Sequence, residues 1–343
     1  MNPSQATPVG NNVLVELQEN DTLIYKSLKL VLPNANIPHN KIAYYCGRVV
    51  KTPKELDGTF FEWHTEMELQ ENDVIMFIYT AGQSIAAMDL YFEHDGKKYA
   101  NIAYPKIYLR IRDGVIQGIN GYIITEAIEK KSVFRNDIFI PKSGNEPIMS
   151  KVIAISTPNK GYRHSPSVDE STIDIEVGDI VFMDIFGAAS IEMFQRIFQK
   201  EIYANQRKHI VGKINNKDMA YNDKNFKLFG DRLVVKVVTP KETKTQSGLI
   251  IPQNAVKREE VEVVHIGTEL TKGSLSIKVL KKAGIEIPEH IKAIAALEVL
   301  LPKKGDKLLI MAFQLNDANA IEFEGAMHYF IPVNETTILA KIS

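Results

Sequence analysis

The chain has 343 residues, of which 45% are hydrophobic and 24% are charged, and its formal net charge is -1. This length exceeds what one core usually holds, so we expect two or three domains, and the near-zero charge gives no reason to expect nucleic acid or a membrane as partner. The single cysteine, Cys46, excludes an intrachain disulfide framework and zinc sites built on paired cysteines, which favours a reducing compartment.

The N-terminal segment is polar. Residues 1–10 lack both the charged leader and the apolar core of a secretory signal, and they are too polar for a membrane span. We therefore expect a soluble, cytoplasmic protein.

The chain then repeats one order of short apolar segments three times, and such internal similarity decides the architecture of a long chain. Each repeat opens with a β-branched strand, at 12–17, 122–128 and 232–238. Three apolar residues and a proline follow, at 30–33, 138–141 and 249–252. A second strand comes next, at 47–53, 150–158 and 260–268. A glycine or asparagine then precedes an aspartate and a third strand, at 71–77, 177–183 and 304–311. Two closing strands end each repeat, within 99–111, 202–214 and 329–342.

Short strands separated by turn signals such as Asp57-Gly58, Asp95-Gly96 and Glu324-Gly325 are typical of small all-β barrels. The sequence therefore predicts an all-β protein of three tandem domains, joined near Asp113-Gly114 and within 215–224. Their predicted bounds are 1–113, 114–217 and 218–343.

Helical patterns are scarce. Pro288 is well placed at a first helical position before 289–299, which predicts a helical insertion within 276–300 of the third repeat. We interpret 191–202 as a hairpin, because it aligns with 85–99 of the first repeat.

The last third of the chain resembles the GroES-type co-chaperonins, the lids of the chaperonin folding chamber, in the order and spacing of its elements. The resemblance is strongest in 226–343 and rests on the runs 230–238, 243–252, 260–267, 304–311 and 337–342. It implies three tandem GroES-like β-barrels that form a homo-oligomer. The implied partner is a GroEL-type chaperonin in its nucleotide-bound state, and the implied function is assistance to protein folding.

The resemblance also implies a chaperonin-binding tripeptide, Leu249, Ile250 and Ile251, flanked by Gly248 and Pro252. The preceding residues are small or polar and bury little, so we expect a mobile segment that a partner orders. From the residues alone, an ordinary buried strand is the alternative.

Two further apolar tripeptides are secondary candidates for binding loops: Leu30, Val31 and Leu32, and Ile138, Phe139 and Ile140. Both lack the Ser-Gly that precedes Leu249. Each tripeptide could be a binding loop, or it could pack in a core or between domains.

We predict no catalytic residue, metal or cofactor. The eight histidines show no ligand spacing, and the chain has neither a dinucleotide fingerprint nor a P-loop. We interpret His265, which lies on a strand, as a packing residue. The alternative function is a structural one, a virion ring or scaffold that has co-opted the GroES fold, because three domains per chain do not tile the family's rings of seven evenly.

Overall fold

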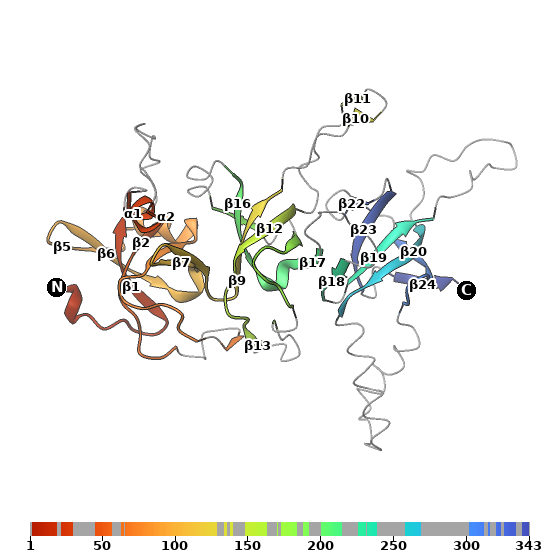
Figure 1. Cartoon of the computed structure of the whole chain (residues 1–343). Coiled ribbons are helices and arrows are strands. Elements are labelled where there is room, and N and C mark those ends of the chain that lie inside the picture. Colours follow the sequence, from red (N-terminus) through yellow and green to blue (C-terminus); the bar gives the residue numbers. More distant parts are fainter. Residues whose placement is uncertain are drawn as a thin grey trace, which may run out of the picture. The chain divides into compact units, whose positions relative to one another are not determined.

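The computed structural model describes most of the predicted strands (Figure 1). The described residues are 2–18, 22–29, 45–56, 63–64, 66–128, 134–135, 138–139, 148–162, 170, 173–183, 188–191, 200–214, 226–230, 232–238, 258–268, 302–311, 315, 320–323, 326–333 and 338–342. The predicted turns at Asp57-Gly58 and Glu324-Gly325, the helical insertion within 276–300 and the interior of the 191–202 hairpin lie outside them.

The fold is mostly antiparallel β. The first sheet has the order β5-β6-β1-β2-β4-β7-β8. Its strands are β1 (Asn12–Gln18), β2 (Cys46–Lys51), β4 (Val74–Phe77), β5 (Phe92–His94), β6 (Lys97–Ala103), β7 (Ile107–Arg112) and β8 (Val115–Gly118). Asp95-Gly96 makes the turn from β5 to β6 as predicted, with φ values of 50° and 73°.

The second sheet has the order β15-β16-β9-β12-β14-β17-β18. Its strands are β9 (Tyr122–Ala127), β12 (Ile148–Ala154), β14 (Ile180–Met183), β15 (Ala188–Ser190), β16 (Ile202–Gln206), β17 (Ile210–Ile214) and β18 (Phe226–Leu228). Two pairs of short strands form separate two-stranded sheets. In one, β3 (Trp63–His64) pairs with β13 (Lys160–Tyr162), and in the other β10 (Phe134–Arg135) pairs with β11 (Ile138–Phe139).

The third sheet has the order β22-β23-β19-β20-β21-β24. Its strands are β19 (Arg232–Val237), β20 (Arg258–Ile266), β21 (Lys307–Met311), β22 (Ala320–Phe323), β23 (Ala326–Pro332) and β24 (Ile338–Ile342). The three sheets therefore share one strand order, in which the first strand of each repeat lies between a closing strand and the second strand.

The contacts of the chain divide it into two compact units. The first comprises 1–127, 151–178 and 188–207, and the second comprises 128–150, 179–187 and 208–343. The three predicted domain bounds stay a prediction.

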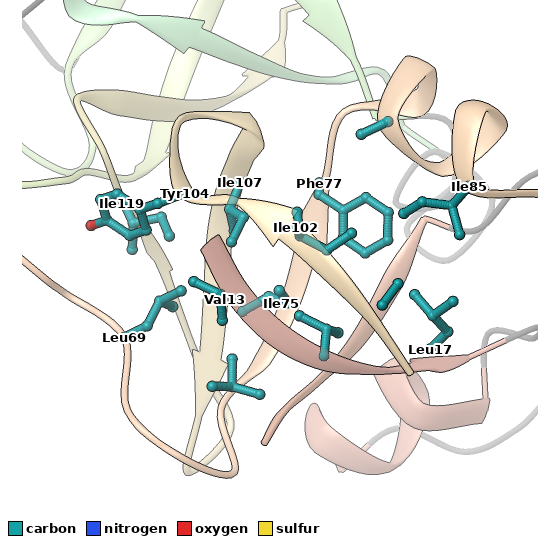
Figure 2. Packing of buried hydrophobic residues seen from close by; sticks show 14 residues of the cluster. Val13, Leu17, Leu69, Ile75, Phe77, Ile85, Ile102, Tyr104, Ile107 and Ile119 are labelled. Atoms are coloured by element: carbon teal, nitrogen blue, oxygen red, sulfur yellow. The ribbon is translucent and has the colours of Figure 1, made fainter. Parts of the chain in front are cut away.

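The core of the first sheet forms because apolar residues alternate along its strands. Figure 2 shows Val13, Ile75, Ile102, Tyr104 and Ile107 packed together, and all five are at most 1% exposed. Two faces of this sheet are apolar, because Leu109 and Ile111 belong to a second buried cluster with Ile124 and Ala204. Strands buried on both faces resist a shift of register.

Two short helices in the first repeat were not predicted from the sequence, which indicated an all-β fold there. They are α1 (Thr22–Ser27) and α2 (Tyr79–Ala87). In α2, Ala81 and Ile85 are buried four residues apart, which is a helical spacing, and Ser84 Oγ donates to Thr80 O over 2.8 Å. The sequence did not reveal this helical period, because the apolar strand β4 comes directly before it. The part of the chain that the structure describes also has the helical turns η1 (Pro3–Gln5), η2 (Tyr104–Lys106) and η5 (Arg207–His209).

The aspartate before each third strand is held by a cation on the closing strand of the same sheet. Asp73 is 1% exposed, and it accepts from Arg112 Nε at 2.6 Å, from Arg112 Nη2 at 2.7 Å and from Gln70 N at 2.9 Å. The other two pairs are Asp179 with Lys213 and Asp306 with Lys341. An irregular step in strand register also recurs three residues after each aspartate, between Met76 and Phe77, between Phe182 and Met183, and between Leu309 and Ile310.

Replacing Asp73 by Ala should destabilise the first sheet by about 3 kcal/mol, because the change leaves Arg112 and the Gln70 amide without their buried acceptor. Urea unfolding followed by circular dichroism measures this loss. The control is Glu71→Ala, which removes an exposed carboxylate from the same turn and should change the free energy of unfolding by less than about 0.5 kcal/mol. Equal effects of the two variants would contradict the role given to Asp73.

Candidate functional site

The strands of the third sheet bring the two ends of segment 239–257 together. β19 and β20 are antiparallel neighbours, with Val237 opposite Val261. Val238 N donates to Glu260 O over 3.0 Å, so the pairing continues to the last described residue of this strand. The segment thus leaves and re-enters the sheet at one end of one strand pair.

The predicted binding residues belong to this connection. Gly248, Leu249, Ile250, Ile251 and Pro252 lie outside the described residues, and their assignment stays a prediction. The described strands determine only where the connection begins and ends.

Burial on both faces fixes the register of β19. Leu233 and Val235 belong to the core of the third sheet, whereas Val234 packs on the opposite face with Phe182 and Phe330. A slip of one residue would exchange these faces. The point at which segment 239–257 leaves the sheet is therefore set by apolar packing.

A turn between β20 and β21 holds the strand on which the segment returns. Val263 N donates to Asp306 O over 2.9 Å, and Gly305 N donates to Val263 O over 2.8 Å. Gly305 has a φ of 86°, a conformation that favours glycine. The Asp306 carboxylate accepts from Lys303 N over 2.7 Å and pairs with Lys341, so it joins this turn to β24.

The pKa of Asp306 is lowered from its ordinary value of 3.8. Burial raises this pKa, but the hydrogen bonds from Lys341 and the Lys303 amide outweigh burial and favour the charged form. A carboxyl with a lowered pKa in the folded state stabilises the fold above its ordinary pKa, and this contribution is lost as the pH falls through the folded pKa.

The connections that carry the secondary candidates leave the first two sheets at the same topological position. In the first sheet, Gln18 pairs with Cys46 across β1 and β2, and the connection between them contains α1; Leu30, Val31 and Leu32 lie outside the described residues. At the corresponding place in the second repeat, Ile128 N donates to Met149 O over 2.9 Å.

The structure describes two of the three residues of the second candidate tripeptide, Ile138 to Ile140. Ile138 and Phe139 form β11, which pairs with β10 through Arg135 opposite Ile138, whereas Ile140 lies outside the described residues. This tripeptide therefore begins with a two-residue strand, which lies in the connection between β9 and β12. Whether it binds a partner stays a prediction.

The residues that the structure describes contain no cluster of three metal-ligating side chains, and they include no helix with the length and apolar content of a membrane span. His265 is a packing residue as predicted, since its ring meets Phe226 edge to face at 5.1 Å between centroids.

Sequence reasoning missed the role of Glu68. Its carboxylate accepts from Asn120 N at 2.6 Å, from Tyr104 Oη at 3.2 Å and from Thr157 N at 3.1 Å, all within the first unit. Glu68 therefore connects the loop before β4 to two other segments, one that precedes β9 and one that follows β12. Nothing in the sequence around Glu68 distinguishes it from an ordinary exposed glutamate.

Comparison with known protein families found a match for the last third of the chain. The model of the Cpn10 family, the chaperonin 10 Kd subunit, matches residues 225–342. The match runs from β18 to β24, and it includes the connection 239–257. It confirms the resemblance for the last third of the chain and suggests a co-chaperonin-like function for that part. A search of the curated proteins found no match.

Replacing Asp306 by Asn should destabilise the third sheet by about 1 kcal/mol at pH 7, because the lysine loses its charged partner. The difference from the wild-type protein should shrink as the pH falls below 3.8, where the wild-type carboxyl itself takes up a proton. Urea unfolding between pH 3 and pH 7 measures both values. The control is Asp95→Asn, which changes an exposed carboxylate in another turn and should alter the free energy of unfolding at pH 7 by less than about 0.5 kcal/mol. A difference for Asp306→Asn that is constant with pH would contradict the assignment.

Proposed function

We propose that the protein is a co-chaperonin-like lid without enzymatic activity, which binds a GroEL-type chaperonin in its nucleotide-bound state and assists protein folding. The observation that carries the proposal is the Cpn10 match, because it contains the connection 239–257 with Leu249, Ile250 and Ile251. The single cysteine, Cys46, is buried, which fits a reducing compartment such as the cytoplasm.

The proposal includes three tandem GroES-like barrels with bounds 1–113, 114–217 and 218–343. Three features support it: the shared strand order, the register step at the same place in the third strands, and the aspartate paired with a cation on the closing strand. Independent folds would not be expected to repeat all three.

The proposed contact is a short extended segment in an apolar groove of the partner. Gly248 gives the backbone freedom before the apolar residues, and Pro252 lacks an amide donor, which limits how far an added strand extends. The side chains of Leu249, Ile250 and Ile251 would supply the apolar surface that the groove buries.

One such segment binds weakly. Burying three aliphatic side chains contributes about 1.5–3 kcal/mol each, while ordering roughly ten loop residues costs about 1–2 kcal/mol apiece. Several segments must therefore act together, because linked sites make the later contacts intramolecular. A homo-oligomer supplies that linkage. The secondary tripeptides, Leu30 to Leu32 and Ile138 to Ile140, would supply it within one chain if they bind.

Replacing Leu249, Ile250 and Ile251 together by Ser should abolish association with a nucleotide-bound GroEL-type chaperonin and the slowing of its ATPase. The change removes apolar surface from a connection between strands, so the free energy of unfolding should stay the same. Co-sedimentation with and without ATP, together with an ATPase assay, measures the effect.

A matched variant replaces Ile138, Phe139 and Ile140 by Ser in the equivalent connection. A smaller loss of affinity than in the first variant fits the proposal. Unchanged chaperonin binding by the Leu249, Ile250 and Ile251 variant would contradict it, and co-purification with virus particles in place of a chaperonin would favour the structural alternative.

A further inference from the structure

The second repeat differs from the other two at the residue that stands two places before its first strand. The first residues of β1, β9 and β19 each pair with the closing strand of their sheet: Asn12 with Ala103, Tyr122 with Gln206, and Arg232 with Pro332. Two places earlier stand Gly10, Asn120 and Gly230, all with positive φ, at 64°, 55° and 74°. Glycine adopts this conformation at no steric cost, so the asparagine of the second repeat suggests a use for its amide side chain.

The side chain of Asn120 is enclosed, unlike the corresponding places in the other repeats. A Cβ atom at Gly10 or Gly230 would have no neighbour within 4 Å in the part of the chain that the structure describes. Asn120, in contrast, is 0% exposed. The residue before it, Ile119, lies beside Tyr104 in the core of the first sheet (Figure 2). The amide of Asn120 is therefore buried where the first and second repeats meet.

Asn120 belongs to a polar cluster that lies within the first compact unit and contains Glu68, Asn120, Ser156, Asn159, Glu170 and Arg207. The Glu68 carboxylate accepts from Asn120 N over 2.6 Å and from Thr157 N over 3.1 Å. This carboxylate therefore holds the turn before β9 next to Ser156 and Thr157, which follow β12.

Arg207 closes the same cluster from the other side. Its Nη2 donates to Ser156 O over 2.9 Å, and its backbone N donates to Gly121 O over 3.1 Å. A Cβ atom at Gly121 would clash with Asn159 Nδ2 and lie 3.1 Å from Glu170 Oε2, so this turn packs directly on both residues. These contacts confine the asparagine, the serine and the arginine to one small region.

Four buried polar atoms of this region have no hydrogen-bond partner among the residues that the structure describes. They are Asn120 Nδ2, Asn120 Oδ1, Ser156 Oγ and Arg207 Nε. Ser156 and Arg207 are 3% and 2% exposed. Buried polar atoms in folded proteins are bonded to other protein groups or to ordered water, because an unbonded one loses its hydration without compensation.

The chemistry of these four atoms fits water better than an ion. Asn120 Nδ2 and Arg207 Nε are donors, whereas Asn120 Oδ1 is an acceptor. The guanidinium of Arg207 would repel a cation, and the carboxylates of Glu68 and Glu170 would repel an anion. Water both donates and accepts, and one buried molecule typically makes about three hydrogen bonds, so water can serve donors and acceptors together.

We propose that ordered water occupies this polar cluster and bonds to the amide of Asn120, to Ser156 Oγ and to Arg207 Nε. The first two repeats then meet in two ways, through the apolar cluster that contains Leu109 and Ile124 and through these bonds. Hydrogen bonds are directional, so the water helps to fix the orientation of β9 relative to the loop before β4. This role is independent of chaperonin binding.

A high-resolution crystal structure of the full chain tests the site directly. It should show ordered water at about 2.7–3.2 Å from Asn120 Oδ1 or Nδ2 and from Ser156 Oγ or Arg207 Nε. Absence of water from this place, or an ion there, would overturn the proposal.

The sign of one substitution tests the same point in solution. Ser156→Ala removes the hydroxyl without straining the backbone, and it should lower the urea concentration at the midpoint of unfolding if water bonds to Ser156 Oγ. Removal of an unbonded buried hydroxyl would instead raise the midpoint, and that result would overturn the proposal. The control is Ser84→Ala, which changes an exposed hydroxyl on α2 and should not lower the midpoint, because alanine favours a helix.

A double variant tests whether the amide and the hydroxyl bond to the same water. Asn120→Gly keeps the positive φ and introduces the residue found at the corresponding places in the other repeats. In this background Ser156→Ala should shift the midpoint much less than it does in the wild-type protein, because the shared water is already lost. Equal shifts in the two backgrounds would overturn the proposed bridge.

Discussion

Antiparallel pairing between the first and second strands of each repeat is the constraint on which the account depends. In the third sheet this pairing runs from Leu233 opposite Ile266 to Val237 opposite Val261, and apolar packing on both faces prevents it from slipping. A long connection can leave such a pair without disturbing the core, because its two ends are already held together. A binding segment at this place keeps the fold and the recognition largely separate.

Much of the β framework could be predicted from the sequence, because β-branched residues alternate with the pleat. The predicted strands at 12–17, 122–128 and 232–238 are β1, β9 and β19. The helix α2 was missed, since Ala81 and Ile85 carry its period in a segment that otherwise reads as a strand. Asp113-Gly114 makes the hairpin between β7 and β8, and the domain junction predicted there stays a prediction.

Pairings between distant residues could not be predicted, because they depend on register. The sequence singles out Asp73, Asp179 and Asp306 before the third strands, but it does not say which cation on the closing strand each one meets. The same limit applies to Glu68 and to the edge strand β8. For the candidate site, the residue types predict Leu249, Ile250 and Ile251, which lie within the Cpn10 match, while the strands define only the ends of their connection.

Hydrogen exchange across segment 239–257, measured with and without a GroEL-type chaperonin and ATP, tests the central claim most directly. The account predicts that the amides of Leu249, Ile250 and Ile251 exchange fast in the free protein and become protected in the nucleotide-dependent complex, while the paired amides of β19 and β20 exchange equally slowly in both states. Protection of these three amides in the free protein, or no change on adding the loaded chaperonin, would contradict the account.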